Sequence, residues 1–168
     1  MFGKWKRLSG SPADIHIVAP VSGVVIPLSE LSDPTFAQGI LGKGVAIRPD
    51  EGRVIAPADG TVELVMETGH AVSMTTEDGV ELLIHIGLDT VRLCGKHYRV
   101  CCESGSGSGS WVTRGQTLVE FDPEAIRADG CDPITPVLVC NAGEYAAIRM
   151  APEGGIHAGE PLFLLRKI

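Results

Sequence analysis

The sequence contains few aromatic residues and few positive charges. Phe, Trp and Tyr make up 5% of the 168 residues, and 14 Lys and Arg stand against 21 Asp and Glu. The formal net charge at pH 7 is −7. Nucleic-acid binding needs a concentrated positive surface, so this composition argues against a nucleic-acid partner.

Long hydrophobic runs are also missing. No stretch approaches the roughly 20 apolar residues that a membrane-spanning helix needs. The N-terminal segment MFGKWKRLSG is basic but lacks the apolar middle of a secretory signal, so we expect a cytoplasmic protein. The first residue is Met, which favours a free-standing protein over a piece of a larger transporter.

The cysteines show no metal-site spacing. Their number is odd and two of them are adjacent, which suits neither a Cys-x-x-Cys site nor a simple set of disulfides. In a reducing compartment we expect free thiols. The five are Cys94, Cys101, Cys102, Cys131 and Cys140.

Glycine and proline, by contrast, are plentiful, with 21 Gly and 11 Pro. Short apolar stretches are interrupted by Gly, Pro, Asp or Ser every 8 to 12 residues, which is typical of an all-β sandwich or barrel. Only 34–41 and 123–128 favour short helices. We expect one domain over 13–168, preceded by a flexible tail over 1–12 and interrupted by a flexible loop, SGSGSGS, over 104–110.

Two phrases recur within the chain. IVAPVSGVV (17–25) and VIAPADGTV (54–62) share Ala-Pro, two residues, Gly, one residue and Val. VTRGQTLVEF (112–121) and IHAGEPLFLL (156–165) share Gly, two residues and Leu. Such phrases are also common turn formulas, because Pro suits strand starts and Gly suits tight turns. The recurrence of two pairs favours duplicated halves.

Residues 68–90 contain a predicted β-hairpin that carries two histidines. Asp78-Gly79 is a strong signal for a two-residue type I′ turn, because Gly accepts a positive φ. With that turn Val72 faces His85, and His70 faces Gly87, whose missing side chain would leave room beside His70. A slip of one residue would send the histidines to opposite faces. In the predicted register one face carries Thr68, His70, His85, Gly87 and Asp89.

Two neighbouring imidazoles in an apolar setting suit phosphoryl transfer. A neutral imidazole, with a pKa of about 6.5, has a nucleophilic nitrogen. One ring could carry the phosphoryl group while the other donates N–H to it, and apolar neighbours would slow hydrolysis. A backbone carbonyl would have to fix the tautomer of the first ring. His16, His97 and His157 show no such cluster and are interpreted as ordinary histidines.

Metal binding is a second interpretation of the pair. His70 and His85, together with the carboxylate of Asp89, could supply zinc ligands, but a structural zinc site takes four. Any zinc here would therefore need a ligand from a partner protein.

The sequence resembles the glucose-type enzyme IIA (EIIA) component of the bacterial phosphoenolpyruvate:sugar phosphotransferase system. The resemblance extends from about Asp14 to the end of the chain. It is most specific in GVELLIHIGLDTV, whose histidine has another histidine fifteen residues upstream. It also includes IVAPVSGVVIPLSEL, VTRGQTLVEFD and TPVLVCN.

The resemblance implies an antiparallel β-sandwich with duplicated halves and no required cofactor. It implies that His85 accepts a phosphoryl group on Nε2 from the phosphocarrier HPr and passes it to a cysteine in the IIB domain of a sugar permease. His70 would stabilise the phosphoryl group, and Thr68 would hydrogen-bond His70. In some members regulatory proteins are further partners, with zinc bridging the two histidines to the partner. Docking would use Phe36, Ile40, Leu41, Met66, Leu83, Val91 and Asp89.

Two other classes fit less well. A zinc metallopeptidase on a similar fold would need an HxxxD ligand pair and an HxH, but Met74 is the fourth residue after His70 and Leu83 stands two before His85. A biotinyl or lipoyl carrier would present a modified Lys in a hairpin turn, whereas this turn is Asp78-Gly79.

The N-terminal tail has a weak amphipathic pattern. Phe2, Trp5 and Leu8 recur every three residues with basic residues between them. This could form a short helix on a membrane surface. Helices of this length are marginal in water, which favours a solvated tail and leaves weak membrane-surface contact as the alternative.

Overall fold

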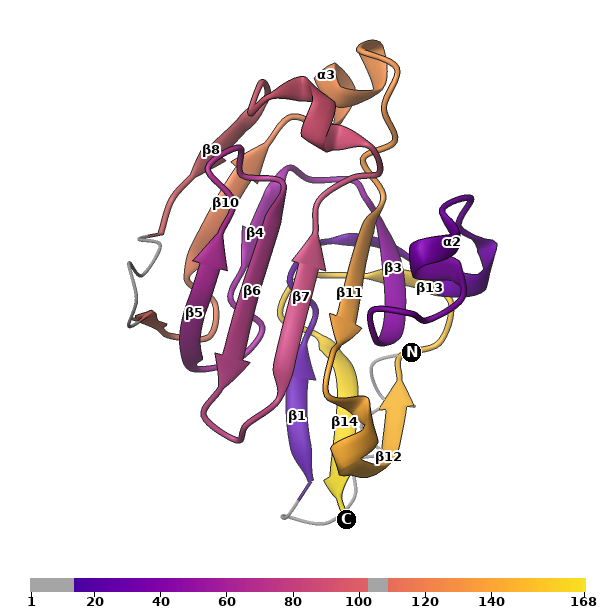
Figure 1. The fold of residues 1–168 in the computed structure, drawn as a ribbon, viewed down its shortest axis with the longest axis vertical. Helices are drawn as coiled ribbons and strands as arrows, with labels where there is room; N and C mark the ends of the chain where they lie inside the picture. The colour runs from indigo at the N-terminus through magenta and orange to yellow at the C-terminus, as the bar shows by residue number, and fades with distance from the viewer. Residues whose placement is uncertain (1–13, 103–108) are drawn as a thin grey trace.

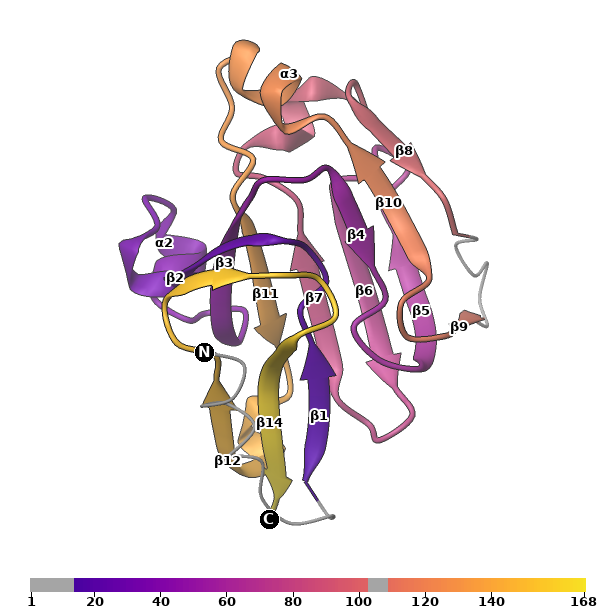
Figure 2. The same cartoon turned by 180° about the vertical axis from the view of Figure 1, so that it is seen from behind.

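The structure, a computed structural model, describes residues 14–102 and 109–168 (Figures 1 and 2). The expected tail, 1–12, and residues 104–108 of the expected loop lie outside the described residues. Ser110, which the sequence placed in that loop, instead begins strand β9.

The described residues form one eight-stranded sheet and two three-stranded sheets. The large sheet has the order β13-β2-β3-β11-β7-β6-β5-β9, and neighbouring strands are antiparallel. Its strands are β2 (Gly23–Pro27), β3 (Lys43–Pro49), β5 (Gly60–Val65), β6 (Ala71–Thr76), β7 (Glu81–His85), β9 (Ser110–Val112), β11 (Thr135–Val139) and β13 (Gly154–Ile156). The small sheets, β1-β14-β12 and β4-β10-β8, comprise β1 (Ile15–Val18), β4 (Arg53–Ile55), β8 (Tyr98–Val100), β10 (Thr117–Phe121), β12 (Tyr145–Met150) and β14 (Pro161–Lys167).

The small sheets cover one face of the large sheet. In Figure 2, β4 lies in front of β6, and β1 lies in front of the lower end of β7. Strand β7 shows the alternation that follows: Leu82 and Ile84 are buried in the main core, whereas Leu83 and His85 are half-buried. Each fully buried aliphatic side chain contributes about 1.5–3 kcal/mol to folding. The expected β-sandwich is confirmed.

Equivalent hydrogen bonds join the two copies of the Ala-Pro phrase. Val18 N–H donates to Pro57 O at 3.0 Å, and Ile55 N–H donates to Pro20 O at 2.8 Å. Each copy therefore completes its backbone bonds on the other copy, which confirms the duplicated halves. The second repeat is matched in the same way, by Ala19 N–H to Glu160 O and Ala56 N–H to Gln116 O, both at 2.8 Å, and by Gly159 N–H to Ala19 O and Gly115 N–H to Ala56 O, both at 2.9 Å.

The hairpin between β6 and β7 has a three-residue loop over 77–79. Gly79 N–H donates to Thr76 O, and Thr76 N–H donates to Val80 O, both at 2.9 Å. Gly79 has a φ of +89°. These features match a type I turn followed by a left-handed glycine. The expected two-residue type I′ turn is therefore wrong.

This longer loop shifts the register of the hairpin by one residue. His85 faces Ala71, and Ile84 faces Val72. His70 nevertheless stays beside His85, because it lies just outside β6, where the chain leaves a turn in which Gly69 N–H donates to Met66 O. The two rings meet at the open end of the hairpin, not through the shared sheet face that the sequence predicted.

Two short helices lie where the sequence placed them. They are α2 (Pro34–Ala37), shorter than the expected 34–41, and α3 (Pro123–Ala128). Each has Pro at its start and an Asp N-cap, Asp33 or Asp122, whose side chain accepts a backbone N–H. There are also three 3₁₀ turns among the described residues: η1 (Leu28–Glu30), η2 (Thr90–Leu93) and η3 (Ala142–Glu144). None of the helices described here has the length and apolarity needed to cross a membrane.

Helix α2 lies beside β3, on the outer part of the large sheet (Figure 1). Its Phe36 is 5% exposed and belongs to a second, smaller apolar cluster. Half-buried Leu83 packs against that cluster. Because Leu83 and His85 share a face of β7, this cluster forms the floor beside His85. Its buried members are Leu31, Phe36, Ala46, Leu88, Ile134 and Leu138.

Candidate active site

His85 is the last residue of β7, and its ring is held by the turn that follows. His85 Nδ1 lies 2.7 Å from Gly87 O. A carbonyl can only accept, so Nδ1–H donates to it, and the lone pair of the neutral ring is on Nε2. The sequence required a carbonyl for this task without identifying it, and the structure assigns it to Gly87.

The turn after His85 depends on Gly87. Its φ is +95°, and a Cβ there would lie 2.4 Å from Thr90 Cγ2 and 3.0 Å from Asp132 O. Its N–H donates to Ile134 O at 3.1 Å. The missing side chain therefore makes room for Thr90 and Asp132, which supply the three atoms nearest to the would-be Cβ.

Gly87→Ala is expected to lower the free energy of unfolding by about 3 kcal/mol, through a strained φ and overpacking. Urea denaturation measures this loss. Gly79→Ala is the matched control, because Gly79 also has a positive φ of +89° but nothing lies within 4 Å of its would-be Cβ. The control should lose only about 1 kcal/mol. Equal losses would contradict the role given to packing against Thr90.

His70 lies against the ring of His85. The ring centroids are 5.3 Å apart at an interplanar angle of 71°, so one edge faces the other ring. His70 is 5% exposed, and its Nδ1 is 2.5 Å from Thr68 Oγ1. The structure thus brings together the three residues expected to act, Thr68, His70 and His85. Phe36 also contacts His85, at a ring-centroid distance of 5.1 Å and an interplanar angle of 56°.

Both histidines have lowered pKa values. Burial lowers the pKa of His85, opposed by the hydrogen bond to Gly87 and by the charge of Asp33. Burial also lowers the pKa of His70, and the neighbouring His85 lowers it further. Each ring therefore stays neutral to a lower pH than a free imidazole, which has a pKa of about 6.5. Asp33, the N-cap of α2, is a neighbour that the sequence did not identify.

The two lowered pKa values predict acid destabilisation. As pH falls below about 6.5, the unfolded chain binds protons on these histidines before the folded chain does. Their contribution to stability is present above that pH and decreases as pH falls towards the folded pKa values. We expect the melting temperature to fall less between about pH 7.5 and pH 5.5 in a His70→Gln/His85→Gln variant than in the wild type. His157→Gln, at an exposed histidine, is the control, and an equal decrease in all three proteins would contradict the prediction.

Apolar side chains lie exposed at four of the expected docking positions. Their exposed fractions are 68% for Ile40, 40% for Leu41, 38% for Met66 and 58% for Val91. Asp89 is exposed as well. Phe36 and Leu83 differ from these, because one is buried in the smaller cluster and the other is half-buried against it. They form the base of the site and not its exposed rim.

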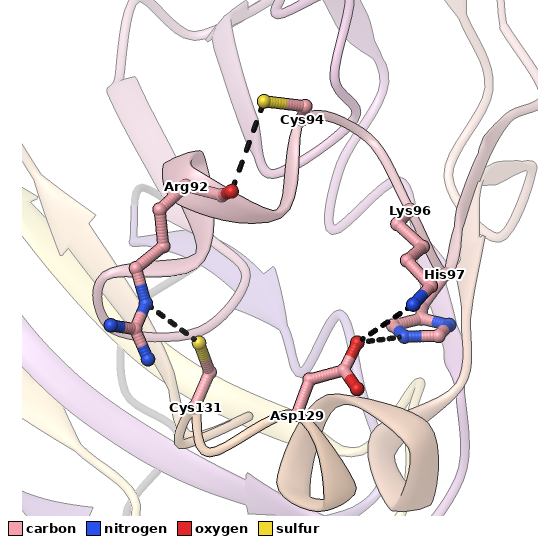
Figure 3. A network of polar contacts seen from close by, with 6 residues as sticks. All are labelled: Arg92, Cys94, Lys96, His97, Asp129 and Cys131. Atoms are coloured by element: carbon pink, nitrogen blue, oxygen red, sulfur yellow. Dashed lines mark hydrogen bonds and ion pairs between the residues drawn. The ribbon is translucent and has the colours of Figure 1, made fainter.

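Polar contacts tie the segment after η2 to the end of α3 (Figure 3). His97 Nε2 and Lys96 Nζ lie 2.7 Å and 3.4 Å from Asp129 Oδ2, and Arg92 Nε donates to Cys131 Sγ at 3.4 Å. The hydrogen bond from His97, assisted by Lys96, lowers the pKa of Asp129. These contacts hold the segment that carries Asp89 and Val91. His97, expected to stand alone, thus has a carboxylate partner.

The described residues contain no ready-made metal site. Across 14–102 and 109–168 there is no group of three or more His, Cys, Asp or Glu that could hold a metal ion. Among these residues Asp89 does not form a three-ligand group with His70 and His85. Zinc shared with a ligand from a partner stays a prediction. The five cysteines are free thiols, as expected.

Known proteins similar to this chain share one family. Residues 15–145 match the model of the phosphoenolpyruvate-dependent sugar phosphotransferase system, EIIA 1. The PTS system glucose-specific EIIBCA component of Corynebacterium glutamicum is 49% identical over 134 residues, which cover 80% of this chain and 19% of that protein. The PTS system glucose-specific EIIA component of Oceanobacillus iheyensis is 40% identical over 149 residues, which cover 89% of this chain and 88% of that protein.

A solved structure, glucose permease IIA from Mycoplasma capricolum, has the same fold. Its TM-score is 0.82 at 29% identity, with 90% of this chain and 95% of that chain covered. The chain spans between 19% and 25% of the length of five EIIBCA relatives that it matches. The family match over most of the sequence and the shared fold agree, and the chain belongs to the EIIA 1 family of the phosphoenolpyruvate-dependent sugar phosphotransferase system.

Proposed function

We propose that this chain is a phosphocarrier that accepts a phosphoryl group on His85 Nε2 from phospho-HPr and passes it to a cysteine of a IIB domain. The observation that carries the proposal is the bond from His85 Nδ1–H to Gly87 O, which leaves the Nε2 lone pair free on a half-buried ring. A nucleophile for phosphorus needs this neutral form with a fixed tautomer.

The first step exchanges one N–P bond for another, and the second exchanges an N–P bond for an S–P bond. The Nε2 lone pair of His85 attacks the phosphorus of phospho-HPr, and the electron pair of the breaking bond returns to the nitrogen of the HPr histidine. In the second step the IIB thiolate attacks the same phosphorus, and the pair returns to His85 Nε2. Such transfers depend mainly on positioning and on stabilising charge on the phosphoryl oxygens.

His70 is placed to supply that stabilisation. If Thr68 Oγ1–H donates to its Nδ1, the proton of the neutral His70 ring is on Nε2 and can be donated to a phosphoryl oxygen. The burial that lowers its pKa keeps the ring uncharged beside His85. Phe36 and the smaller apolar cluster limit the water that could hydrolyse the phosphohistidine.

The exposed apolar side chains fit the proposed partners. Ile40, Leu41, Met66 and Val91 would form a docking surface that both HPr and IIB use in turn, with Asp89 at its edge. Relatives such as the β-glucoside-specific EIIBCA component of Dickeya chrysanthemi support a IIB partner, since their names combine IIB with IIA in one protein. We place the exchange in the cytoplasm, in accord with five free thiols.

A labelling experiment tests the proposal. The chain is incubated with enzyme I, HPr and radiolabelled phosphoenolpyruvate, and the modified nitrogen is mapped by NMR of the ring. We expect label that depends on HPr and lies on His85 Nε2. Label on another residue, or no transfer when HPr is present and active, would overturn it. Zinc added with and without a IIB domain would test the shared metal site separately.

A further inference from the structure

Tyr98 reaches the turn after His85 from a different sheet. It begins β8, in the β4-β10-β8 sheet, and its hydroxyl donates to Ile86 O at 2.7 Å. Thr90 Oγ1 donates to the same carbonyl at 2.9 Å. Two hydroxyl groups therefore hold one buried carbonyl oxygen.

Ile86 connects the two histidines through its backbone. Its N–H donates to His70 O at 2.6 Å, and its carbonyl precedes Gly87, the residue whose own carbonyl accepts from His85 Nδ1. The orientation of the Ile86–Gly87 peptide thus affects where the Gly87 carbonyl points. A group that holds Ile86 O restrains that orientation.

The Tyr98 side chain is itself well fixed. Its ring stacks on Phe121 with centroids 6.3 Å apart and an interplanar angle of 21°. Its Cβ lies against the turn before His70, since a Cβ added at Gly69 would come within 2.9 Å of it. Burial raises the pKa of Tyr98 to about 12, so its hydroxyl stays a donor at neutral pH. Tyr98 therefore contacts the turns that carry both histidines.

We infer that Tyr98 is a positioning residue for His85, holding the Ile86–Gly87 peptide so that the Gly87 carbonyl keeps the proton of His85 on Nδ1. The consequence for transfer rests on the proposed function, because it concerns the availability of the Nε2 lone pair to phosphorus. The effect on the tautomer does not depend on that function.

The test compares Tyr98→Phe with Tyr145→Phe. These are the two tyrosines of the chain, and Tyr145 is buried at the start of β12, outside the histidine site. In Tyr98→Phe we expect NMR shifts of the ring nitrogens to show a smaller share of the Nδ1–H tautomer of His85. The pKa of His85 should fall further, because the bond to Gly87 opposes its lowering. The rate of phosphoryl acceptance should fall about threefold to tenfold, as expected for the loss of one neutral hydrogen bond.

The outcomes separate two failures. If the wild type is phosphorylated on His85 and Tyr98→Phe matches it in tautomer and rate, the inference is overturned. If the wild type is not phosphorylated on His85, the proposed function fails, and the nitrogen shifts still decide the tautomer question. Thr90→Val removes the other donor to Ile86 O and should shift the tautomer in the same direction. Unchanged shifts in both variants, or an equal change in Tyr145→Phe, would also overturn the inference.

Discussion

Replacing His85 with alanine is expected to abolish phosphoryl acceptance from phospho-HPr, with a loss of more than about 1000-fold in the initial rate. In the described part of the chain, only His85 combines an Nδ1–H bond to a backbone carbonyl with a second imidazole at its side. The Nε2 of His97 is hydrogen-bonded to Asp129, and His16 and His157 are exposed. The measurement is the rate of label incorporation from phosphoenolpyruvate through enzyme I and HPr.

The fold of the His85→Ala variant has to be checked beside its activity. His85 is half-buried, so its replacement should leave thermal unfolding cooperative and the β-sheet signal of circular dichroism unchanged. His157→Ala serves as the activity control, because it removes an exposed histidine and should label like the wild type. Labelling of His85→Ala at another residue would show that the nucleophile has been misassigned.

Replacing His70 has a different expected result, since acceptance and donation should separate. His70→Ala should still accept from phospho-HPr at a rate near that of the wild type, because the bond to Gly87 still keeps the Nε2 lone pair of His85 free. Donation to IIB should slow about 100-fold, since the N–P bond then breaks without a fixed donor for the phosphoryl oxygens. Single-turnover chase of the labelled protein with a IIB domain measures the second step alone.

Thr68→Val provides a graded companion to His70→Ala. It removes the hydroxyl at His70 Nδ1 and keeps the imidazole, so the preferred tautomer of His70 is weakened and not lost. Donation should slow by about threefold to tenfold, as expected for one hydrogen bond. Normal donation by His70→Ala would contradict the role of His70. A larger effect of Thr68→Val than of His70→Ala would contradict the tautomer argument.

The turn in the hairpin shows how far local sequence rules extend. Asp78-Gly79 located the turn correctly, because a glycine with positive φ is needed in either loop length. It did not decide between two and three loop residues. That choice depends on Thr76 bonding Val80 through both its backbone and its side chain. The histidines still met, because His70 lies outside the strand, where alternation no longer applies.

Contacts between distant parts of the chain explain what sequence reasoning missed. Phe36 was expected on the docking surface. In the structure it is buried in the smaller apolar cluster, whose other members come from several strands and turns. Tyr98 comes from a sheet that contributes no other side chain to the hydrogen bonds described at His85. No residue spacing in the sequence predicts a single contact of this kind. The repeated Ala-Pro phrases, by contrast, predicted the duplicated halves directly. Periodic and repeated features were therefore predictable, and single long-range contacts were not.

The pairing of β1 with β14 has a consequence for how the domain is made. Ile15 faces Leu165, and β1 has no other strand partner among the described residues. During synthesis β1 therefore remains without its strand partner until β14 has left the ribosome. Loop closure over such a separation is slow, and nascent chains with unpaired apolar strands are prone to aggregate. The interlocked halves thus make completion of the small sheet a late event in the synthesis of the domain.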